Sequence, residues 1–319
     1  MREHAACSIN YKQLVFRLIA KEPLILPAYK GSTLRGGFGY AFKRVVCAIR
    51  DKECPDCLLK EKCVYSYVFE TPPPSDTKIM RKYKSAPHPF VIEPPPERRR
   101  GYKPGDEINF NLILIGRAID YLPYFIYTFD ELGKIGIGKG KAGYELTEVS
   151  CEGKKIYDSE AKTLKSFSFS AMPVKFHDLD SETSNLQLLT LNFITPTRIL
   201  YDGHLTLDLE FHMLIRQLLR RLSLLYYFHC NGDPTDGDFK GIIEKAKDVK
   251  VKKRDLRWYD WERYSGRQET RIKMGGFVGE ITFEGNLESF MPFIKVGEVL
   301  HVGKGTGFGL GKYEITKDK

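Results

Sequence analysis

The sequence lacks any long run of apolar residues, and no segment approaches the roughly 18–20 residues that a membrane-spanning helix needs. Its first residues, MREHAACSINYKQ, also lack the apolar stretch of a secretory signal. Neither a membrane protein nor an exported protein is therefore indicated. We expect a cytoplasmic chain with no membrane partner.

A secreted disulfide framework is missing as well, because the seven cysteines are odd in number and unevenly spaced. Four of them follow the spacing C-x6-C-x2-C-x5-C: Cys47, Cys54, Cys57 and Cys63. Four thiolates can close a tetrahedral site, so we predict a structural zinc that fixes the preceding helix to the following strand. An iron–sulfur cluster and free buried thiols are the alternatives. A closed four-ligand site leaves no position for substrate, so no catalytic metal is assigned.

Positive charge and aromatic residues are plentiful. The net charge is +9, and there are 18 Tyr and 20 Phe in 319 residues. A basic, aromatic-rich chain favours nucleic acid as partner, although a basic surface without a partner is the alternative. The 42% apolar content and the length suit two domains of ordinary size.

A glycine-rich loop over residues 303–311 dominates the end of the chain, with glycine at every second position. Such a loop has a nearly bare backbone with many amide donors, which suits close approach to a phosphate chain. A shorter version lies at 138–143, and both continue into Tyr-Glu and an aliphatic residue. The repetition indicates a duplicated domain.

The order of elements argues against nucleotide-binding motifs at both loops. Residues 138–143 match G-x-G-x-x-G, but a helix is expected before them and a strand after them, the reverse of a dinucleotide fold. In the terminal loop, Thr306 stands where a phosphate-binding loop needs glycine, and Tyr313 replaces its Ser or Thr. A plain glycine-rich turn remains the structural alternative for both.

The periodicity of apolar residues predicts the order βαββαβ twice. In the first half we expect strands over 12–19, 64–69, 107–115 and 144–149, and helices over 31–50 and 121–132. In the second half we expect strands over 186–194, 256–261, 277–283 and 312–316, and helices over 208–228 and 287–294. The predicted fold is α+β, with tandem ferredoxin-like (RRM-like) domains over residues 1–155 and 156–319. The first carries the cysteine knuckle 47–63 and an irregular proline-rich loop 71–96.

Several segments together resemble a known family. They are residues 257–260 (RWYD), 263–268 (RYSGRQ), 273–279 (KMGGFVG), the terminal loop, and the opening stretch 30–39 (KGSTLRGGFG). This set resembles the CRISPR-associated endoribonucleases of the RAMP superfamily, which process precursor RNA into guide RNA (crRNA). The resemblance implies tandem ferredoxin-like RNA-binding domains, a CRISPR repeat RNA as partner, and contact with subunits of a CRISPR effector complex.

The resemblance also implies a chemistry. The 2′-hydroxyl of the RNA attacks the adjacent phosphate without a metal, leaving a 2′,3′-cyclic phosphate and a 5′-hydroxyl. The usual catalytic histidine of the family lies in the first helix, yet residues 29–50 contain no histidine. That departure supports an alternative, a catalytically inactive RAMP subunit that only binds RNA.

Candidate catalytic residues follow from the resemblance. His301, directly before the glycine loop, is the predicted general acid or base, and a structural histidine at a helix end is the alternative. Tyr29, Arg35, Tyr40 and Lys43 are predicted to line the wall that the first helix contributes. A solvated helix face is the alternative for these four.

Candidate RNA-binding residues are basic side chains among aromatics and the glycines of the loop, since charges track phosphates and rings stack on bases. They are Arg263, Arg267, Arg271, Lys273, Gly303, Lys304, Gly305, Gly307, Gly309, Gly311 and Lys312. His212 and Arg216 are added because they share a helix face with Arg220; a solvated face is the alternative. His4, His88 and His177 lie in poorly organised segments and receive no role.

Overall fold

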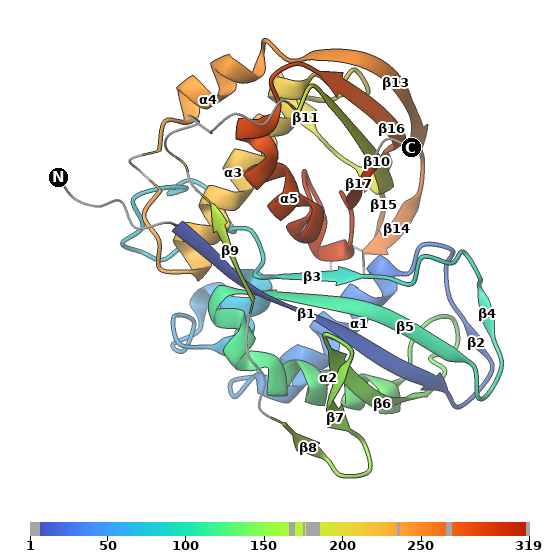
Figure 1. Ribbon diagram of the computed structural model, residues 1–319. Helices are drawn as coiled ribbons and strands as arrows, with labels where there is room; N and C mark the ends of the chain where they lie inside the picture. The colour runs from blue at the N-terminus through green and yellow to red at the C-terminus, as the bar shows by residue number, and fades with distance from the viewer. Residues whose placement is uncertain are drawn as a thin grey trace. The chain divides into compact units, whose positions relative to one another are not determined.

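The computed structural model of the chain describes residues 7–165, 170–174, 176, 186–234, 237–265 and 270–316. The chain divides into two compact units. In Figure 1 the colour runs along the chain from blue at the N-terminus to red at the C-terminus. The N-terminal unit holds Asn10–Ala171 with Phe228–Cys230, and the C-terminal unit holds Met1–Ile9, Met172–Tyr227 and Asn231–Lys319. The division therefore falls later than the expected boundary after residue 155, because β7 and β8 extend the sheet of the first half.

The N-terminal unit has a main antiparallel sheet and a separate two-stranded sheet of β2 and β4, and α1 and α2 pack against each other. Its strands are β1 (Cys7–Ala20), β2 (Leu24–Ile25), β3 (Phe90–Glu93), β4 (Gly101–Tyr102), β5 (Glu107–Ile115), β6 (Tyr144–Cys151), β7 (Lys154–Asp158) and β8 (Thr163–Leu164). Its helices are α1 (Gly31–Val46) and α2 (Leu122–Ile135), with short helical turns at Cys54–Asp56, Ser66–Glu70 and Gly116–Tyr121. The sheet order β3-β5-β1-β6-β7-β8 places the four strands of the β1-α1-β3-β5-α2-β6 series side by side.

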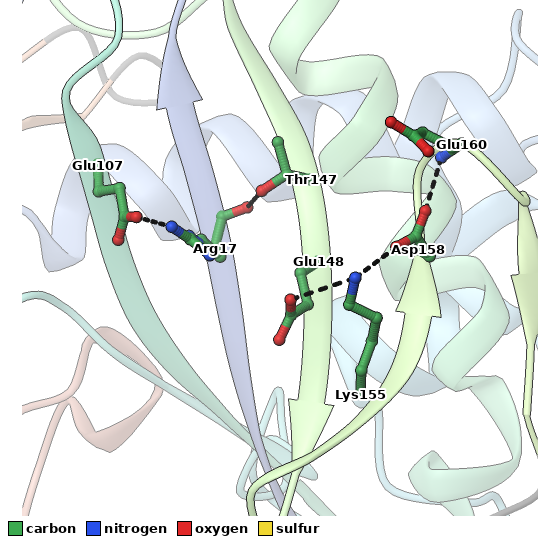
Figure 2. Close-up of polar contacts among 7 residues, drawn as sticks. All are labelled: Arg17, Glu107, Thr147, Glu148, Lys155, Asp158 and Glu160. Atoms are coloured by element: carbon green, nitrogen blue, oxygen red, sulfur yellow. Dashed lines mark hydrogen bonds and ion pairs between the residues drawn. The ribbon is translucent and has the colours of Figure 1, made fainter.

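Strand β1 shows how this sheet is held. Leu14, Phe16 and Leu18 are fully buried under the helices, while the residues between them face the open side of the sheet. On the open side Arg17 pairs with Glu107 of β5 (Figure 2). The same view shows Lys155 between Glu148 and Asp158, the backbone amide of Glu160 bonded to Asp158, and the hydroxyl of Thr147 bonded to the backbone oxygen of Arg17. Exposed ion pairs contribute little each, so the burial of alternate residues supplies most of the stability.

Two expectations for the first half are wrong. Residues 64–69 form no strand: Val64 and Tyr65 are helical, and a π-helix follows at Ser66–Glu70. The rings of Tyr65 and Phe69 stack 5.4 Å apart, which the helical spacing of four residues allows. The proline-rich loop 71–96 is also not wholly irregular, because β3 lies within it, is buried throughout and pairs with β5. Its apolar residues form a buried strand although prolines flank them, because an edge strand tolerates proline.

The π-helix lies directly on α1 at a glycine. A Cβ at Gly39 would come within 2.1 Å of the Phe69 ring. On either side of this contact, the Arg35 guanidinium lies 4.6 Å from the Phe69 ring centroid, and the Lys43 ammonium 5.9 Å from that of Tyr65. The absence of a side chain at Gly39 thus lets the rings of Tyr65 and Phe69 pack beside the cationic groups of Arg35 and Lys43 on α1.

Replacing Gly39 with alanine should force the Phe69 ring off the helix and lower the free energy of unfolding by about 1–3 kcal/mol, the usual cost of overpacking. Gly36→Ala is the matched control on the same helix, since a Cβ there meets no atom within 4 Å. It should be stabilising by about 0.5–1 kcal/mol, because alanine favours helices over glycine. Urea unfolding measures both, and equal effects of the two substitutions would contradict the close packing at Gly39.

The C-terminal unit repeats the element order. Its strands are β10 (Leu188–Thr197), β11 (Leu200–Tyr201), β12 (His204–Leu205), β13 (Lys250–Tyr259), β14 (Glu262–Ser265), β15 (Thr270–Lys273), β16 (Gly276–Glu284) and β17 (Tyr313–Thr316). Its helices are α3 (Phe211–His229), α4 (Phe239–Ala246) and α5 (Met291–Leu300), with turns at Glu288–Phe290 and Thr306–Phe308, and β9 (Ser170–Val174) lies at the boundary of the units. The sheet order β13-β16-β10-β17 matches β3-β5-β1-β6, so both units are mixed α+β with antiparallel sheets and the same strand order.

The predicted elements agree with the structure best where periodicity is long. β5 spans the predicted residues 107–115, whereas β13 extends over ten residues instead of the short strand expected at 256–261. Within the described ranges, no helix is long and apolar enough to cross a membrane.

Candidate functional site

The glycine loop of the C-terminal unit is a tightly folded turn. Gly303, Gly305, Gly309 and Gly311 have φ between 77° and 83°, and Thr306–Phe308 forms a 3-10 turn. A Cβ at Gly311 would lie 1.8 Å from the Val302 carbonyl oxygen, and one at Gly303 would lie 2.6 Å from that of Arg198. The glycines are therefore required by the packing of the loop on the protein's own backbone.

Many amides of the loop bond to the protein itself. The Lys304 amide donates to Arg198 (3.0 Å), the Gly311 amide to Pro196 (3.2 Å) and the Val302 amide to Gly311 (3.0 Å). The Phe308 and Gly309 amides bond within the turn, and the Lys312 amide donates to the hydroxyl of Thr195. These donors are not offered to a phosphate, and side chains such as the exposed Lys304 are left for that contact.

His301 lies inside this packing. It ends α5 with φ 65° and ψ 169°, a conformation that glycine favours, and its side chain is fully buried. Its Nδ1 donates to the Leu310 carbonyl at 3.0 Å. At the preceding residue, Nε of buried Arg221 donates to the Leu300 carbonyl at 2.9 Å, and burial lowers the pKa of Arg221 to about 9. The geometry favours a structural role, and the predicted acid–base role stays a prediction.

Two substitutions separate these roles. His301→Ala should lower the free energy of unfolding by about 1–3 kcal/mol, because the buried Leu310 carbonyl loses its donor. His301→Asn keeps a donor, and we expect it to retain the wild-type rate of any RNA cleavage within about threefold. Urea unfolding and single-turnover kinetics measure the two effects. A stable Asn variant about 10²-fold slower would instead establish proton transfer by the ring.

Basic side chains surround the loop. The Arg263 guanidinium lies 4.9 Å from the Phe308 ring centroid, and Nη1 of Arg198 donates to the Gly275 carbonyl at 2.8 Å. Burial lowers the pKa of both arginines. Arg271 and Lys273 are exposed on β15, whereas Arg267 lies outside the described residues. The sequence alone does not predict a role for Arg198, because a single arginine at the end of a strand forms no recognisable motif.

His212 and Arg216 do share a face of α3, with Arg220 exposed one turn further on. The ring of Tyr201 lies 5.8 Å from the His212 ring and 5.9 Å from the Arg216 guanidinium. Burial lowers the pKa of His212, and Arg216 adds to that effect while Glu210 opposes it. The cluster thus places a guanidinium and an imidazole on the same helix face.

The predicted residues of the first helix lie in different settings. Tyr40 is 55% exposed and accepts a hydrogen bond from Arg44 at 3.0 Å, and Lys43 is partly covered by Tyr65. Tyr29 is half-buried just before α1. Lys30 beside it is fully buried, donates to the Glu97 carbonyl at 2.7 Å, and has a pKa lowered by burial.

Arg35 makes the most distinctive contact of the helix. Its Nη2 lies 2.7 Å from Nε2 of His88, a histidine to which the sequence assigned no role. Nδ1 of His88 lies 3.1 Å from the Thr71 hydroxyl, and the imidazole stacks on Phe90 with ring centroids 5.6 Å apart. The sequence holds one sign that His88 could be part of a folded site: it lies just before the short apolar run that forms β3.

The four clustered cysteines are free and partly exposed. Burial raises the pKa of Cys54, and Lys43 opposes that effect. Cys47 points its thiol at the Ile49 carbonyl, 3.2 Å away. Among the described residues no three metal-ligating side chains converge into a site, so this arrangement does not fit a formed zinc centre.

Zinc binding stays a prediction of the sequence, and it requires the thiols to move together. Metal analysis of protein purified without chelator decides the matter. About one zinc per chain, lost in Cys54→Ser and kept in Cys230→Ser, would support a thiolate site. Protein that contains no zinc as purified, and whose four thiols all react with a thiol reagent, would contradict the predicted zinc site.

Comparisons with known proteins extend over both units. Residues 9–168, about half of the chain, match the AF_1859_N family, described as an N-terminal domain, and the chain belongs to it. Residues 191–313 match the family model of the CRISPR-associated endoribonuclease Cas6. An uncharacterized protein of Archaeoglobus fulgidus is 22% identical over 295 residues, which is 91% of this chain and 92% of the relative.

Solved structures share the fold. Thermus thermophilus Cas6 (TTHB231) has a TM-score of 0.54 and 16% identity, with 97% of this chain and 99% of that chain covered. The product complex of Cas6 (TTHB231) has a TM-score of 0.58 and 17% identity, over 96% and 100% of the two chains. A chain of a partial Cas6-RT-Cas1–Cas2 complex has a TM-score of 0.56 and 14% identity, over 97% of this chain and 46% of that chain. The C-terminal part of the chain is therefore similar in sequence to the CRISPR-associated endoribonuclease Cas6, and the chain shares the fold of solved Cas6 structures.

Proposed function

We propose that this protein cuts CRISPR repeat precursor RNA into guide RNA by attack of the 2′-hydroxyl on the adjacent phosphate, without a metal. The observation that carries the proposal is the Cas6 family match over residues 191–313, which contains the glycine loop and the basic hairpin β14–β15. The repeated strand order of the two units supports tandem ferredoxin-like domains as the scaffold.

The side chains supply the functions that this reaction needs. It requires an aligned nucleophile, stabilisation of charge on phosphate and two proton transfers. We assign phosphate contacts to exposed Lys304, Arg271 and Lys273, with Arg263 beside Phe308 as a cation next to a ring on which a base can stack. Within the N-terminal unit, we assign further RNA contacts to Arg35, Tyr40 and Lys43 on α1 and to Tyr29 before it.

Partners follow from the same proposal. The RNA is the repeat precursor and then the crRNA product, and subunits of a CRISPR effector complex are further candidates. The solved structures with this fold include a Cas6 product complex, which supports RNA as a partner, and a Cas6-RT-Cas1–Cas2 complex, which supports assembly with other CRISPR-associated proteins.

The second candidate is a RAMP subunit that binds RNA without cutting it. It is favoured by one observation, the absence of histidine from residues 29–50. Tight binding of an intact repeat RNA would support it.

Incubation with a repeat RNA in EDTA tests the proposed function. We expect one cut, with a 2′,3′-cyclic phosphate on the upstream fragment and a 5′-hydroxyl on the downstream fragment. Treatment of the upstream fragment with acid and phosphatase, followed by mass analysis, identifies the cyclic end. A cut that appears only when magnesium is added, or a 3′-hydroxyl product, would contradict the mechanism, because a 2′-hydroxyl nucleophile needs no metal and always leaves the cyclic end.

A further inference from the structure

The contact between Arg35 and His88 links a basic group of α1 to a histidine that lies 53 positions further along the chain. Both belong to the N-terminal unit. On the basis of the proposed function, we propose that His88 is the general base of RNA cleavage and that Arg35 covers its reactive nitrogen until a phosphate draws the guanidinium away.

The protonation of the ring follows from its partners. A guanidinium is always a donor, so Nε2 of His88 must accept the 2.7 Å hydrogen bond from Arg35 and carries no proton. The hydroxyl of Thr71 donates its own proton to the Ala86 carbonyl at 3.0 Å, so its oxygen accepts from Nδ1 of His88. Both neighbours fix the same neutral tautomer, with the proton on Nδ1 and a lone pair on Nε2, which is the form that a base requires.

The imidazole is held rigidly from several sides. Its ring stacks on Phe90 and Phe69, with centroids 5.6 and 6.2 Å away. Thr71 is buried and has φ 46°, a costly conformation for a β-branched residue, and it is tied to Ala86 by two hydrogen bonds. Strain of this kind tends to concentrate at functional sites, where it fixes a side chain in advance.

The cover over Nε2 is exchangeable. Arg35 lies over the Phe69 ring, and its Nη2 donates to the neutral imidazole of His88. A phosphate offers charge-assisted hydrogen bonds in bidentate geometry, which are stronger than a bond to a neutral acceptor. Binding of RNA would therefore move the guanidinium onto the phosphate and expose the lone pair beside the scissile position.

Another histidine of the N-terminal unit is less suited. His229 is 4% exposed, and its two ring nitrogens are bonded to the Tyr67 hydroxyl at 3.1 Å and to the Pro87 carbonyl at 2.7 Å. His88 is half-buried and pairs with a group that prefers phosphate. The structure thus distinguishes a buried histidine from an accessible one.

In the proposed step, Nε2 takes the proton of the 2′-hydroxyl as that oxygen forms a bond to phosphorus. The bond between phosphorus and the 5′-oxygen breaks, and the leaving oxygen takes a proton from water. The products are a 2′,3′-cyclic phosphate and a 5′-hydroxyl. His88 becomes an imidazolium that returns its proton to solvent, so no other reactant is needed.

Single-turnover cleavage of a repeat RNA in EDTA tests the proposal with His88→Ala, Arg35→Lys and, as matched control, His204→Ala, an exposed histidine on β12. General-base removal is typically worth about 10²–10⁴-fold, so His88→Ala should be at least about 10²-fold slower at neutral pH. Its affinity for a repeat RNA with a 2′-deoxy substitution at the cut, which cannot react, should stay within about threefold of wild type. Added imidazole should restore part of the rate of His88→Ala, a response that a purely structural role would not give.

Arg35→Lys gives a second, independent measurement. A lysine cannot form the bidentate phosphate contact, so the affinity of Arg35→Lys for the 2′-deoxy RNA should fall about tenfold. At saturating protein, the cleavage rate of Arg35→Lys should still depend on pH through the ionisation of His88, a dependence that His88→Ala should lack. His204→Ala should match wild type in both assays.

The outcomes separate the two proposals. A wild-type protein that binds repeat RNA but never cuts it removes the proposed function itself. The role of His88 is overturned if the wild-type protein cuts and the folded His88→Ala variant, binding RNA normally, cuts equally fast. It is also overturned if that variant is slower but added imidazole restores none of its rate. In both cases the proposed function still stands.

Discussion

The close contact between Gly39 of α1 and the Phe69 ring supports the rest of the N-terminal unit. With no side chain at Gly39, the π-helix can approach α1 closely. That approach places the Phe69 ring under the Arg35 guanidinium, and the chain then turns at Thr71 in a left-handed conformation. The turn and the following strand β3 bring His88 to Arg35, so one missing Cβ underlies the candidate catalytic pair.

The glycine loop of the C-terminal unit uses the same freedom for a different purpose. Its glycines let the backbone fold onto Pro196 and Arg198, and its amides largely satisfy the protein's own carbonyls. Under the proposed function, contact with RNA would therefore fall to side chains beside the turn, above all Lys304 and the neighbouring Arg263. Buried His301 and Arg221 brace the turn from beneath through the Leu310 and Leu300 carbonyls.

The two units share a strand order but differ in what they carry. The C-terminal unit presents mostly cations, whose charge does not change near neutral pH, and these suit phosphate binding. The N-terminal unit presents an imidazole with a fixed tautomer, which suits proton transfer. Under the proposed function, duplication would thus have supplied one scaffold for two tasks, binding and chemistry.

Periodicity and composition are local properties, and they suffice to predict the repeated βαββαβ order, the long helices, strand β5 and the basic, aromatic character of the chain. The resemblance to CRISPR-associated endoribonucleases is confirmed by the Cas6 family match over residues 191–313. The folded chain was needed to show that residues 64–70 are helical and that β3 lies inside the proline-rich segment. It was also needed to show that His301 is buried and that His88 contacts Arg35. These outcomes depend on which distant side chains share a core, and pairings such as Gly39 with Phe69 leave no periodic signal in a single sequence.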